Sequence, residues 1–296
     1  MQEFEFTGKA MGTAYAISIV CDSEDLVTSI SEETIKKIER YEKRFSRFLP
    51  ESELSRLNNT KNMIVSGEFI LVTKKALELF TLTKGIFNPL VQIGRMGYDK
   101  DFSKIDVTDS LDDTDTYDID FETVSIDDRG NRIILKDGQK LDFGGFLKGY
   151  LAEILCKKIM KESLLIKGAI VNIGGDIHTE GTDVDGKLFI FDIYNPVTEE
   201  EIPITLHNQS LATSATYKRA WLRSNEPVHH ILDSSGMRNP ESDILSASVI
   251  GTDGGKTEAY AKVFINLGEK AMTVLPEKDI QFVLISKDGL ITKNFI

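Results

Sequence analysis

The chain has 296 residues, 41% hydrophobic and 28% charged, which is typical of a folded globular protein. Its formal net charge is −12 and no Lys/Arg cluster is evident, which argues against binding to nucleic-acid phosphates. No apolar stretch reaches the roughly 18 residues of a membrane helix, and the first residues, MQEFEF, lack the features of a signal peptide. We therefore expect a cytoplasmic protein, or a trimmed form of an exported one.

The two cysteines, Cys21 and Cys156, lie in apolar stretches with no His or Cys cluster around them. We expect both to be reduced and structural, and neither to bind a metal. Residues 106–128 hold a dense run of Asp and Glu. This run lacks the glycine turn and terminal Glu of a calcium loop, which favours a solvated loop over a cation site.

The first part of the chain predicts a strand or hairpin followed by two helices. Residues 4–21 alternate in polarity and are rich in β-formers, with Gly12 in the middle. Residues 23–45 place apolar side chains at helical spacing. A second helix is predicted over 68–84, with Ser66 as its N-cap.

The rest of the chain predicts runs of strands and helices without strict βαβ alternation, which favours an α+β fold with mixed or antiparallel sheets and flanking helices. The sequence shows no internal repeat and no linker, so we expect one domain over 1–296, with two lobes. The predicted elements are an irregular segment at 87–99, a hairpin over 123–135, a helix over 145–161, strands over 169–173, 188–194, 202–206, 230–232 and 246–250, a helix over 256–267 with a short one after it, and strands over 282–285 and 290–292.

The segment 142–150, DFGGFLKGY, is the first candidate for chemistry because it lies where a strand passes into a helix. Glycines at a helix start let backbone N–H groups approach an anion, and the helix dipole favours negative charge there. Lys148 would lie about one turn into the helix and could reach a phosphate. The alternative is a tight turn with a surface lysine, since the segment matches neither a Walker motif nor a dinucleotide fingerprint.

Three further segments have both a functional and an ordinary interpretation. In 171–177 an apolar strand runs into Gly-Gly-Asp, which marks either a close approach by a ligand or a simple turn. His229 and His230 offer a general base, although adjacent side chains on a strand point to opposite faces, and either could be a surface or core histidine. Glu258 and Lys262 have the i, i+4 spacing of a helical ion pair, or Glu258 lies in the first turn near a bound cation or phosphate.

Taken together and in order, these segments resemble the ApbE family of FAD:protein FMN transferases across nearly the whole chain. Each motif is weak alone, but eight in the same order form a strong signal. The matching segments are 11–13 (MGT), 46–58 (SRFLPESELSRLN), 87–99, 142–150, 172–176 (NIGGD), 212–217 (ATSATY), 230–233 (HILD) and 258–262 (EAYAK).

The resemblance implies a reaction in which FAD is split at its pyrophosphate. The FMN half is transferred to a Ser or Thr hydroxyl of an acceptor flavoprotein, AMP is released, and Mg²⁺ neutralises developing charge. It implies His230 as the general base, the Gly145 carbonyl and Glu258 as metal ligands, and these FAD-binding residues: Met11, Phe48, Pro89, Leu90, Val91, Asp142, Lys148 and Ile231.

The sequence departs from the family pattern at three of these positions. Phe48 replaces the usual Tyr, Glu258 stands where many members have Asp, and Lys262 stands in place of a metal-binding Thr. A protonated lysine cannot ligate a cation. It would either replace part of the metal's charge or pair with Glu258. Two alternatives therefore remain beside the transferase, namely an FAD pyrophosphatase and an FAD-binding protein without turnover.

Overall fold

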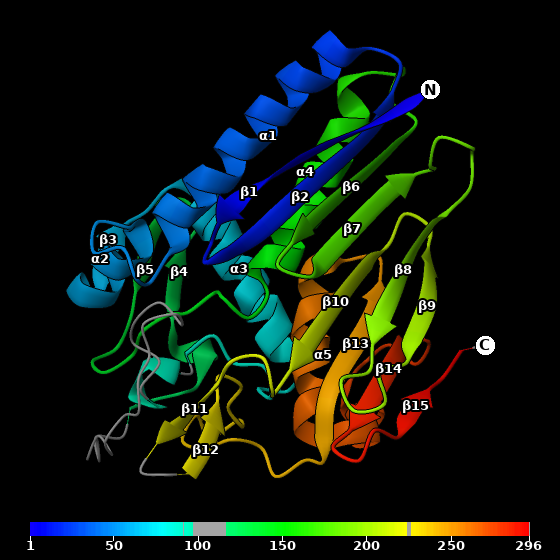
Figure 1. Ribbon diagram of the computed structural model, residues 1–296. Helices are drawn as coiled ribbons and strands as arrows, with labels where there is room; N and C mark the ends of the chain where they lie inside the picture. Colours follow the sequence, from blue (N-terminus) through cyan, green and yellow to red (C-terminus); the bar gives the residue numbers. More distant parts are fainter. Residues whose placement is uncertain (91, 97–116, 224–225, 296) are drawn as a thin grey trace.

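The central feature is an eight-stranded sheet in which each strand is antiparallel to its neighbours (Figure 1). The computed structural model describes residues 1–90, 92–96, 117–223 and 226–295. In sheet order the strands are β1 (Gln2–Ala10), β2 (Thr13–Cys21), β6 (Gly168–Ile173), β7 (Asp176–Gly181), β10 (Ser210–Ala215), β13 (Ile244–Gly251), β14 (Gln281–Ser286) and β15 (Ile291–Lys293). This sheet and the helices around it confirm the predicted α+β class.

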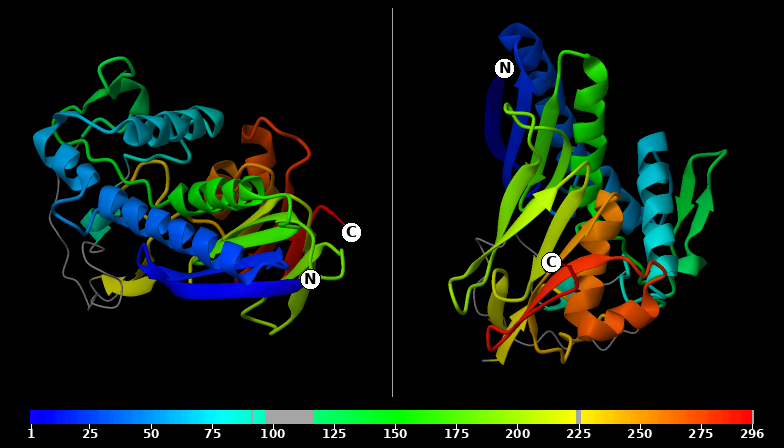
Figure 2. Two further views of the ribbon diagram at one scale, coloured as in Figure 1. Left: turned by 90° about the horizontal axis from the view of Figure 1, so that it is seen from above. Right: turned by 90° about the vertical axis from the view of Figure 1, so that its right-hand side faces the viewer.

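Three helices cover one face of the sheet, and a two-stranded ribbon covers the other (Figures 1 and 2). The helices are α1 (Glu24–Phe45), α4 (Leu147–Glu162) and α5 (Gly254–Leu267), and the ribbon is formed by β8 (Phe189–Tyr194) and β9 (Glu201–Leu206). Side chains alternate between the faces along each strand. Val249 accordingly belongs to the core under the helices, whereas Ile250 belongs to the smaller core under the ribbon.

A smaller group of elements lies at the other end of the helical layer (Figure 1). It is joined to the main core by an aromatic cluster, in which the ring of Phe69 lies 5.3 Å from that of Phe45 and 5.5 Å from that of Phe143. Its members are α2 (Glu53–Thr60), α3 (Gly67–Leu82), β3 (Asn62–Ile64), β4 (Ser125–Asp127), β5 (Arg132–Ile134) and the 3-10 helices Ile93–Met96 and Phe121–Thr123. The remaining described elements are the hairpin of β11 (Ala220–Arg223) and β12 (Glu226–His229), the 3-10 helix Gly268–Lys270, and α6 (Ala271–Val274).

Local sequence signals explain several element boundaries. Ala10 pairs with Thr13, so Met11 and Gly12 form a two-residue turn, and their φ angles of 55° and 69° are those of a hairpin turn with left-handed residues. The hydroxyl of Ser66 accepts a hydrogen bond from the N–H of Phe69 and caps α3. The predicted hairpin at 4–21 and both predicted N-terminal helices are therefore confirmed.

Other predictions were wrong or incomplete. The strand expected at 230–232 is a bend and irregular chain, and the strand lies earlier, at Glu226–His229. Helix α2 and strands β7 and β10 were not predicted. Cys21 and Cys156 are free and buried, as expected. No helix within the described ranges has the length and apolarity needed to cross a membrane.

Some predictions stay untested. Part of the irregular segment at 87–99 and residues 106–116 of the acidic run at 106–128 lie outside the described residues. The prediction of one domain over the full length also stays a prediction.

Helices α4 and α5 approach each other at two glycines. A Cβ on Gly254 would lie 2.1 Å from the carbonyl oxygen of Gly149, and a Cβ on Gly149 would lie 2.4 Å from that of Gly254. We expect Gly254→Ala to lower the free energy of unfolding by at least ~1–3 kcal/mol, because the two backbones must separate. Urea denaturation measures this loss. Gly67→Ala in α3 is the matched control: nothing lies within 4 Å of its added Cβ, and an equal loss there would contradict the explanation.

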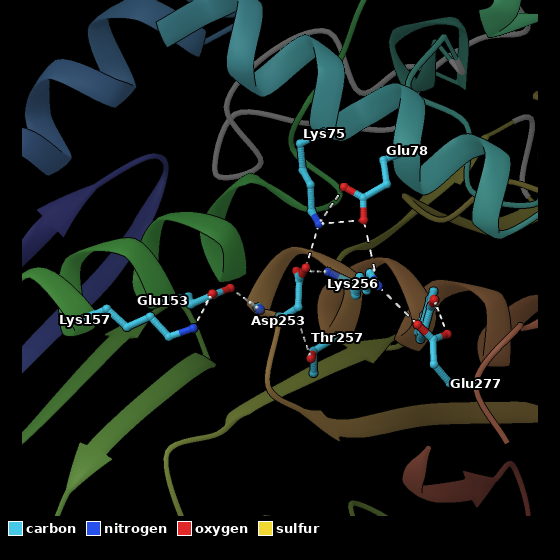
Figure 3. A network of polar contacts seen from close by, with 10 residues as sticks. Lys75, Glu78, Glu153, Lys157, Asp253, Lys256, Thr257 and Glu277 are labelled. Carbon is cyan, nitrogen blue, oxygen red and sulfur yellow. Dashed lines mark hydrogen bonds and ion pairs between the residues drawn. The ribbon is translucent and has the colours of Figure 1, made fainter. Parts of the chain in front are cut away.

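A network of ion pairs fixes the start of α5 against α3 and α4 (Figure 3). Asp253 caps α5 through the N–H of Lys256 at 2.9 Å and binds the ammonium of Lys75, from α3, at 2.6 Å. The N–H of Gly254 donates to the carboxylate of Glu153, from α4, at 2.7 Å. These contacts set the position of the start of α5, the helix that carries Glu258 and Lys262.

Candidate active site

Asp142, in the turn before α4, connects several segments of the site. Its N–H donates to the carbonyl oxygen of Pro89 at 2.8 Å, and one carboxylate oxygen accepts from the N–H of Gly144 at 2.8 Å. The other carboxylate oxygen lies 3.2 Å from Nε of Arg47, whose guanidinium lies 4.3 Å from the ring centroid of Phe48. The backbone and carboxylate of Asp142, together with Arg47, thus bring together three predicted FAD-binding residues, Asp142, Pro89 and Phe48.

The start of α4 lies directly beside α5. Phe146 occupies the N-cap position of α4 and makes no side-chain capping bond. A Cβ on Gly145 would lie 2.8 Å from the ring of Phe87 and 3.4 Å from Cε of Lys262. Gly145 is therefore a glycine because its surroundings leave no room for a side chain, and Lys262 lies against the chain just before the helix.

Four charged side chains meet at this point, two lysines and two carboxylates. The ammonium of Lys148 binds the carboxylate of Asp176 and lies 2.9 Å from Oε1 of Glu258. The ammonium of Lys262 lies 3.3 Å from the same Oε1, while Oε2 of Glu258 accepts from the N–H of Gly149 at 2.9 Å. We call Lys148, Asp176, Glu258 and Lys262 the charge cluster. It joins α4, the start of β7 and α5.

Burial and mutual attraction set the pKa values in the charge cluster. Burial alone would lower the pKa of Lys148, but Asp176 and Glu258 raise it above its ordinary value. Burial opposes ionisation of Glu258, yet Lys148 and Lys262 hold its pKa below the ordinary value. Burial, with the neighbouring carboxylate of Glu258, raises the pKa of Asp176, and burial lowers that of Lys262. Lys148 and Glu258 are therefore the firmly ionised pair at the centre of the cluster.

His230 follows β12 and lies near the charge cluster. Its Nδ1 is buried and has no hydrogen-bond partner in the described part of the chain. Burial, and then the positive charges of Arg219 and Lys262, lower the pKa of His230 to about 3. The imidazole is consequently neutral at physiological pH and has a ring nitrogen without a partner in that part of the chain. A pKa near 3 makes it a weak base, so it needs a neighbouring anion that raises its pKa before it can serve as a general base.

The neighbouring His229 has different surroundings. Its Nδ1 accepts from the N–H of Ile231 at 3.3 Å and lies 3.3 Å from the side-chain amide of Asn239. It lines a cavity of about 310 Å³ with residues that include Asn239 and Lys287. No member of the charge cluster lines this cavity. The two histidine side chains therefore have different neighbours, as expected. Only His229, however, is part of a strand.

The turn between β1 and β2 lies next to the turn before β7. A Cβ on Gly174 would lie 2.7 Å from the hydroxyl oxygen of Thr13, and the N–H of Gly174 donates to the carbonyl oxygen of Ala14 at 2.9 Å. Met11 is half-buried in the first turn, and its N–H donates to Glu42 at 2.7 Å. This pairing of turns places the segment of Met11 close to the backbone that leads into Asp176.

The other predicted residues have mixed positions. The side chains of Leu90 and Ile231 are buried, with exposed fractions of 0% and 4%, so in this structure they pack into the protein interior. Phe48 is exposed. Val91 lies outside the described residues.

A second polar arrangement, formed by Ser210, His178 and Glu180, lies on β10 and β7. Nδ1 of His178 lies 2.6 Å from the hydroxyl oxygen of Ser210, and its Nε2 lies 2.9 Å from the carboxylate of Glu180. These contacts have the order of a nucleophilic triad. Ser210 is only 1% exposed and His178 is fully buried, so a substrate has no access to the serine. The arrangement satisfies buried polar groups in the centre of the sheet.

Comparison with known proteins identifies the family. Residues 11–284 match the profile of the ApbE family. The chain belongs to the ApbE family. It is 24% identical to the FAD:protein FMN transferase of Haemophilus influenzae, over 97% of this chain and 88% of that protein. It is 21% identical to the enzyme of the same name from Escherichia coli, over 95% of this chain and 84% of that protein.

Solved structures of ApbE proteins share the fold. The ApbE protein of Thermotoga maritima superposes with a TM-score of 0.85 at 23% identity, covering 99% of this chain and 97% of that one. The flavin transferase ApbE of Vibrio cholerae gives a TM-score of 0.78 at 21% identity, covering 99% and 96%. The arrangement of sheet and helices described above is therefore that of the ApbE family.

Sequence reasoning did not place Asp176, Arg47 or Ser214 in the site of this ApbE protein. Asp176 binds Lys148, Arg47 binds Asp142, and the hydroxyl of Ser214 lies 3.4 Å from the ammonium of Lys262. The Gly-Gly-Asp turn was a usable signal for Asp176, because an acidic residue directly after a glycine turn is held at a strand end. Arg47 and Ser214 lie in the matching segments 46–58 and 212–217, but nothing within those segments singled them out.

The lowered pKa of His230 predicts a loss of stability in acid. An unfolded histidine titrates near 6.5, so the unfolded state binds a proton first and stability falls as pH decreases below that value toward 3. Between pH 7 and 5 we expect His230 to account for a loss of about 1–2 kcal/mol. Urea denaturation at several pH values measures it, and His230→Gln should remove most of this dependence. An identical pH dependence in the variant would contradict the assigned environment.

Proposed function

We propose that this protein transfers the FMN moiety of FAD to a Ser or Thr hydroxyl of an acceptor flavoprotein and releases AMP. Relatives that carry the name FAD:protein FMN transferase align with at least 95% of this chain in the two cases above. The geometry adds one supporting observation: His230 is neutral, its Nδ1 has no partner among the described residues, and it is close enough to Lys262 for that charge to lower its pKa. This transfer needs two parts: a base that takes the hydroxyl proton, and a positively charged site that binds the diphosphate.

The proposed step is a phosphoryl-type transfer. The acceptor hydroxyl oxygen forms a bond to the phosphorus on the FMN side of the pyrophosphate, and the bond from that phosphorus to the bridging oxygen breaks. AMP leaves with the bridging oxygen, and His230 takes the hydroxyl proton. Such reactions are accelerated mainly by positioning and by stabilising the charge on the phosphoryl oxygens. A bound pyrophosphate also raises the pKa of a neighbouring imidazole, which makes it a better base.

The FAD pocket in this proposal runs from the turn at Met11 to Pro89. Phe48 offers an aromatic face next to Arg47, and Asp142 holds Arg47 and the Pro89 backbone in place. Lys148 keeps its charge because Asp176 and Glu258 flank it. Ile231 and Leu90 support the pocket from the interior, since both are buried.

The residues present do not fit the Mg²⁺ that the resemblance implies. Mg²⁺ requires about six oxygen ligands at ~2.0–2.1 Å in an octahedron. Glu258, the predicted carboxylate ligand, already binds two ammonium groups and the N–H of Gly149. Across the part of the chain that the structure describes, no three His, Cys, Asp or Glu side chains are grouped to hold a metal ion. The proposed step therefore involves no metal ion.

The proposed function is tested by incubating the protein with FAD and a protein that carries a candidate flavinylation site. AMP together with protein-bound flavin supports the transferase. AMP with free FMN, and no bound flavin, identifies an FAD pyrophosphatase instead. FAD that binds and stays intact in every mixture identifies an FAD-binding protein without turnover.

A further inference from the structure

The side-chain ammonium of Lys262 is a cation that lies among three oxygen atoms. Its ammonium lies 3.3 Å from Oε1 and 3.3 Å from the carbonyl oxygen of Glu258, and 3.4 Å from the hydroxyl oxygen of Ser214. All three distances are long for hydrogen bonds of an ammonium, which are shortest at about 2.7–2.9 Å. The ammonium is therefore held in place but is not fully engaged, and it can make a shorter bond to an added anion.

The charge cluster is balanced without an added ion. Two lysines face two carboxylates, so the formal charges sum to zero when all four are ionised. A dication placed among these groups would lie beside two ammonium groups in a buried site, where like charges repel strongly. Glu258 cannot relieve this repulsion because its oxygens already bind Lys148, Lys262 and the N–H of Gly149.

Lys262 is also placed to meet a phosphate. Its side chain is 18% exposed, in contrast with 2% for Glu258, so it is the accessible side of the pair. Its Cε lies against Gly145, just before α4, where the N–H of Gly149 already donates to Glu258. An ammonium beside this end of the helix can bind an oxygen of a doubly negative diphosphate, and the helix dipole favours the negative charge there.

We propose that the ammonium of Lys262 replaces a divalent cation in this protein, so that the diphosphate of FAD binds without added metal. This proposal rests on the proposed function for the identity of the ligand. The lysine supplies a fixed positive charge beside Gly145, and Glu258 and Ser214 hold it there. In this proposal the side chain of Lys262 neutralises part of the negative charge of the FAD diphosphate.

The test measures FAD affinity by flavin fluorescence, once with EDTA and once with Mg²⁺. We expect the dissociation constant of the wild-type protein to differ by less than about twofold between the two conditions, and Lys262→Met to weaken binding at least ~10-fold in both. Lys262→Arg keeps the charge and should retain most of the affinity. Lys256→Met, on the same helix but in the ion-pair network of Figure 3, is the matched control and should bind FAD normally.

Two results overturn the proposal: wild-type protein that binds FAD only with Mg²⁺, or Lys262→Met protein that binds FAD as tightly as wild type. Should Lys262→Met fail to fold, the comparison of wild-type protein with EDTA and with Mg²⁺ still decides. Failure of the proposed function is distinguishable. FAD that binds in EDTA but is never cleaved refutes the transferase and leaves the role of Lys262 standing. If FAD binds only with Mg²⁺ and its flavin is then transferred, the transferase stands and the role of Lys262 is refuted.

Discussion

Replacing His230 with alanine should lower the rate of FMN transfer at least ~100-fold, the usual contribution of a positioned general base. The ring is neutral because burial and two nearby positive charges disfavour the imidazolium, and its Nδ1 has no partner within the described residues. It can therefore accept the hydroxyl proton without first breaking a hydrogen bond at that nitrogen. FAD affinity should change little, since the charge that meets the diphosphate comes from lysines.

The measurement is the initial rate of protein-bound flavin formation at saturating FAD, together with the dissociation constant for FAD. His207→Ala is the matched control, because His207 is an exposed histidine away from the charge cluster. A rate that stays at the wild-type value in His230→Ala removes this residue from the mechanism. A loss of FAD affinity as large as the loss of rate would assign it to binding instead.

Replacing Lys148 with methionine should lower the free energy of unfolding by about 3–5 kcal/mol, because it leaves buried carboxylates without their partner. Lys148 contacts both Asp176 and Glu258, whose side chains are only 4% and 2% exposed. Methionine has a similar length but supplies no charge. The loss should become smaller as pH falls, since protonation of Asp176, whose pKa is already raised by burial, removes one uncompensated charge.

Urea denaturation at neutral and mildly acidic pH measures both effects. The control is Lys158→Met, also on α4, because Lys158 pairs with Glu33 at 3.3 Å on the surface and is 56% exposed. Such exposed pairs contribute about 0–1 kcal/mol. Equal losses in the two variants, or a loss at Lys148 that grows in acid, would contradict the buried network described above.

The elements that were predicted from the sequence are those with a strong local signal. The hairpin at 4–21 has alternating polarity and a turn at Gly12, and α1 and α3 have serine caps and helical spacing. The strand β10 was missed because its sequence, SLATSA, has no alternation: it lies between β7 and β13, and most of its residues are buried. Small polar residues in a central strand are explained by their neighbours in the sheet, which a local pattern does not contain.

The misplaced strand before Asp233 has a related cause. Ile231 and Leu232 are apolar and buried, which imitates a strand, but they pack as irregular chain after β12. The true strand, Glu226–His229, contains Pro227, which weakens the local strand pattern. A proline is tolerated there because β11 and β12 form a two-stranded ribbon, where each strand has an edge that needs no N–H donor.

The site itself was predictable in part. The sequence motifs singled out Lys148, Glu258 and His230 as candidates, and in the structure these three lie in one region. The motifs did not show that Glu258 is shared between Lys148 and Lys262, because that contact depends on how α4 and α5 cross. The crossing is set by Gly149 and Gly254, whose role is visible only when the two backbones are placed together.

The bond between Lys148 and Glu258 joins residues 110 positions apart, and the strands between them must be in place before it forms. Contacts of such large sequence separation form slowly, because a long stretch of chain loses freedom before the contact stabilises it. During synthesis, the N-terminal helices and β1, β2 and β6 emerge well before α5. We therefore expect a nascent chain that ends before α5 to lack the charge cluster, so that the ability to bind flavin appears only in the last stage of folding.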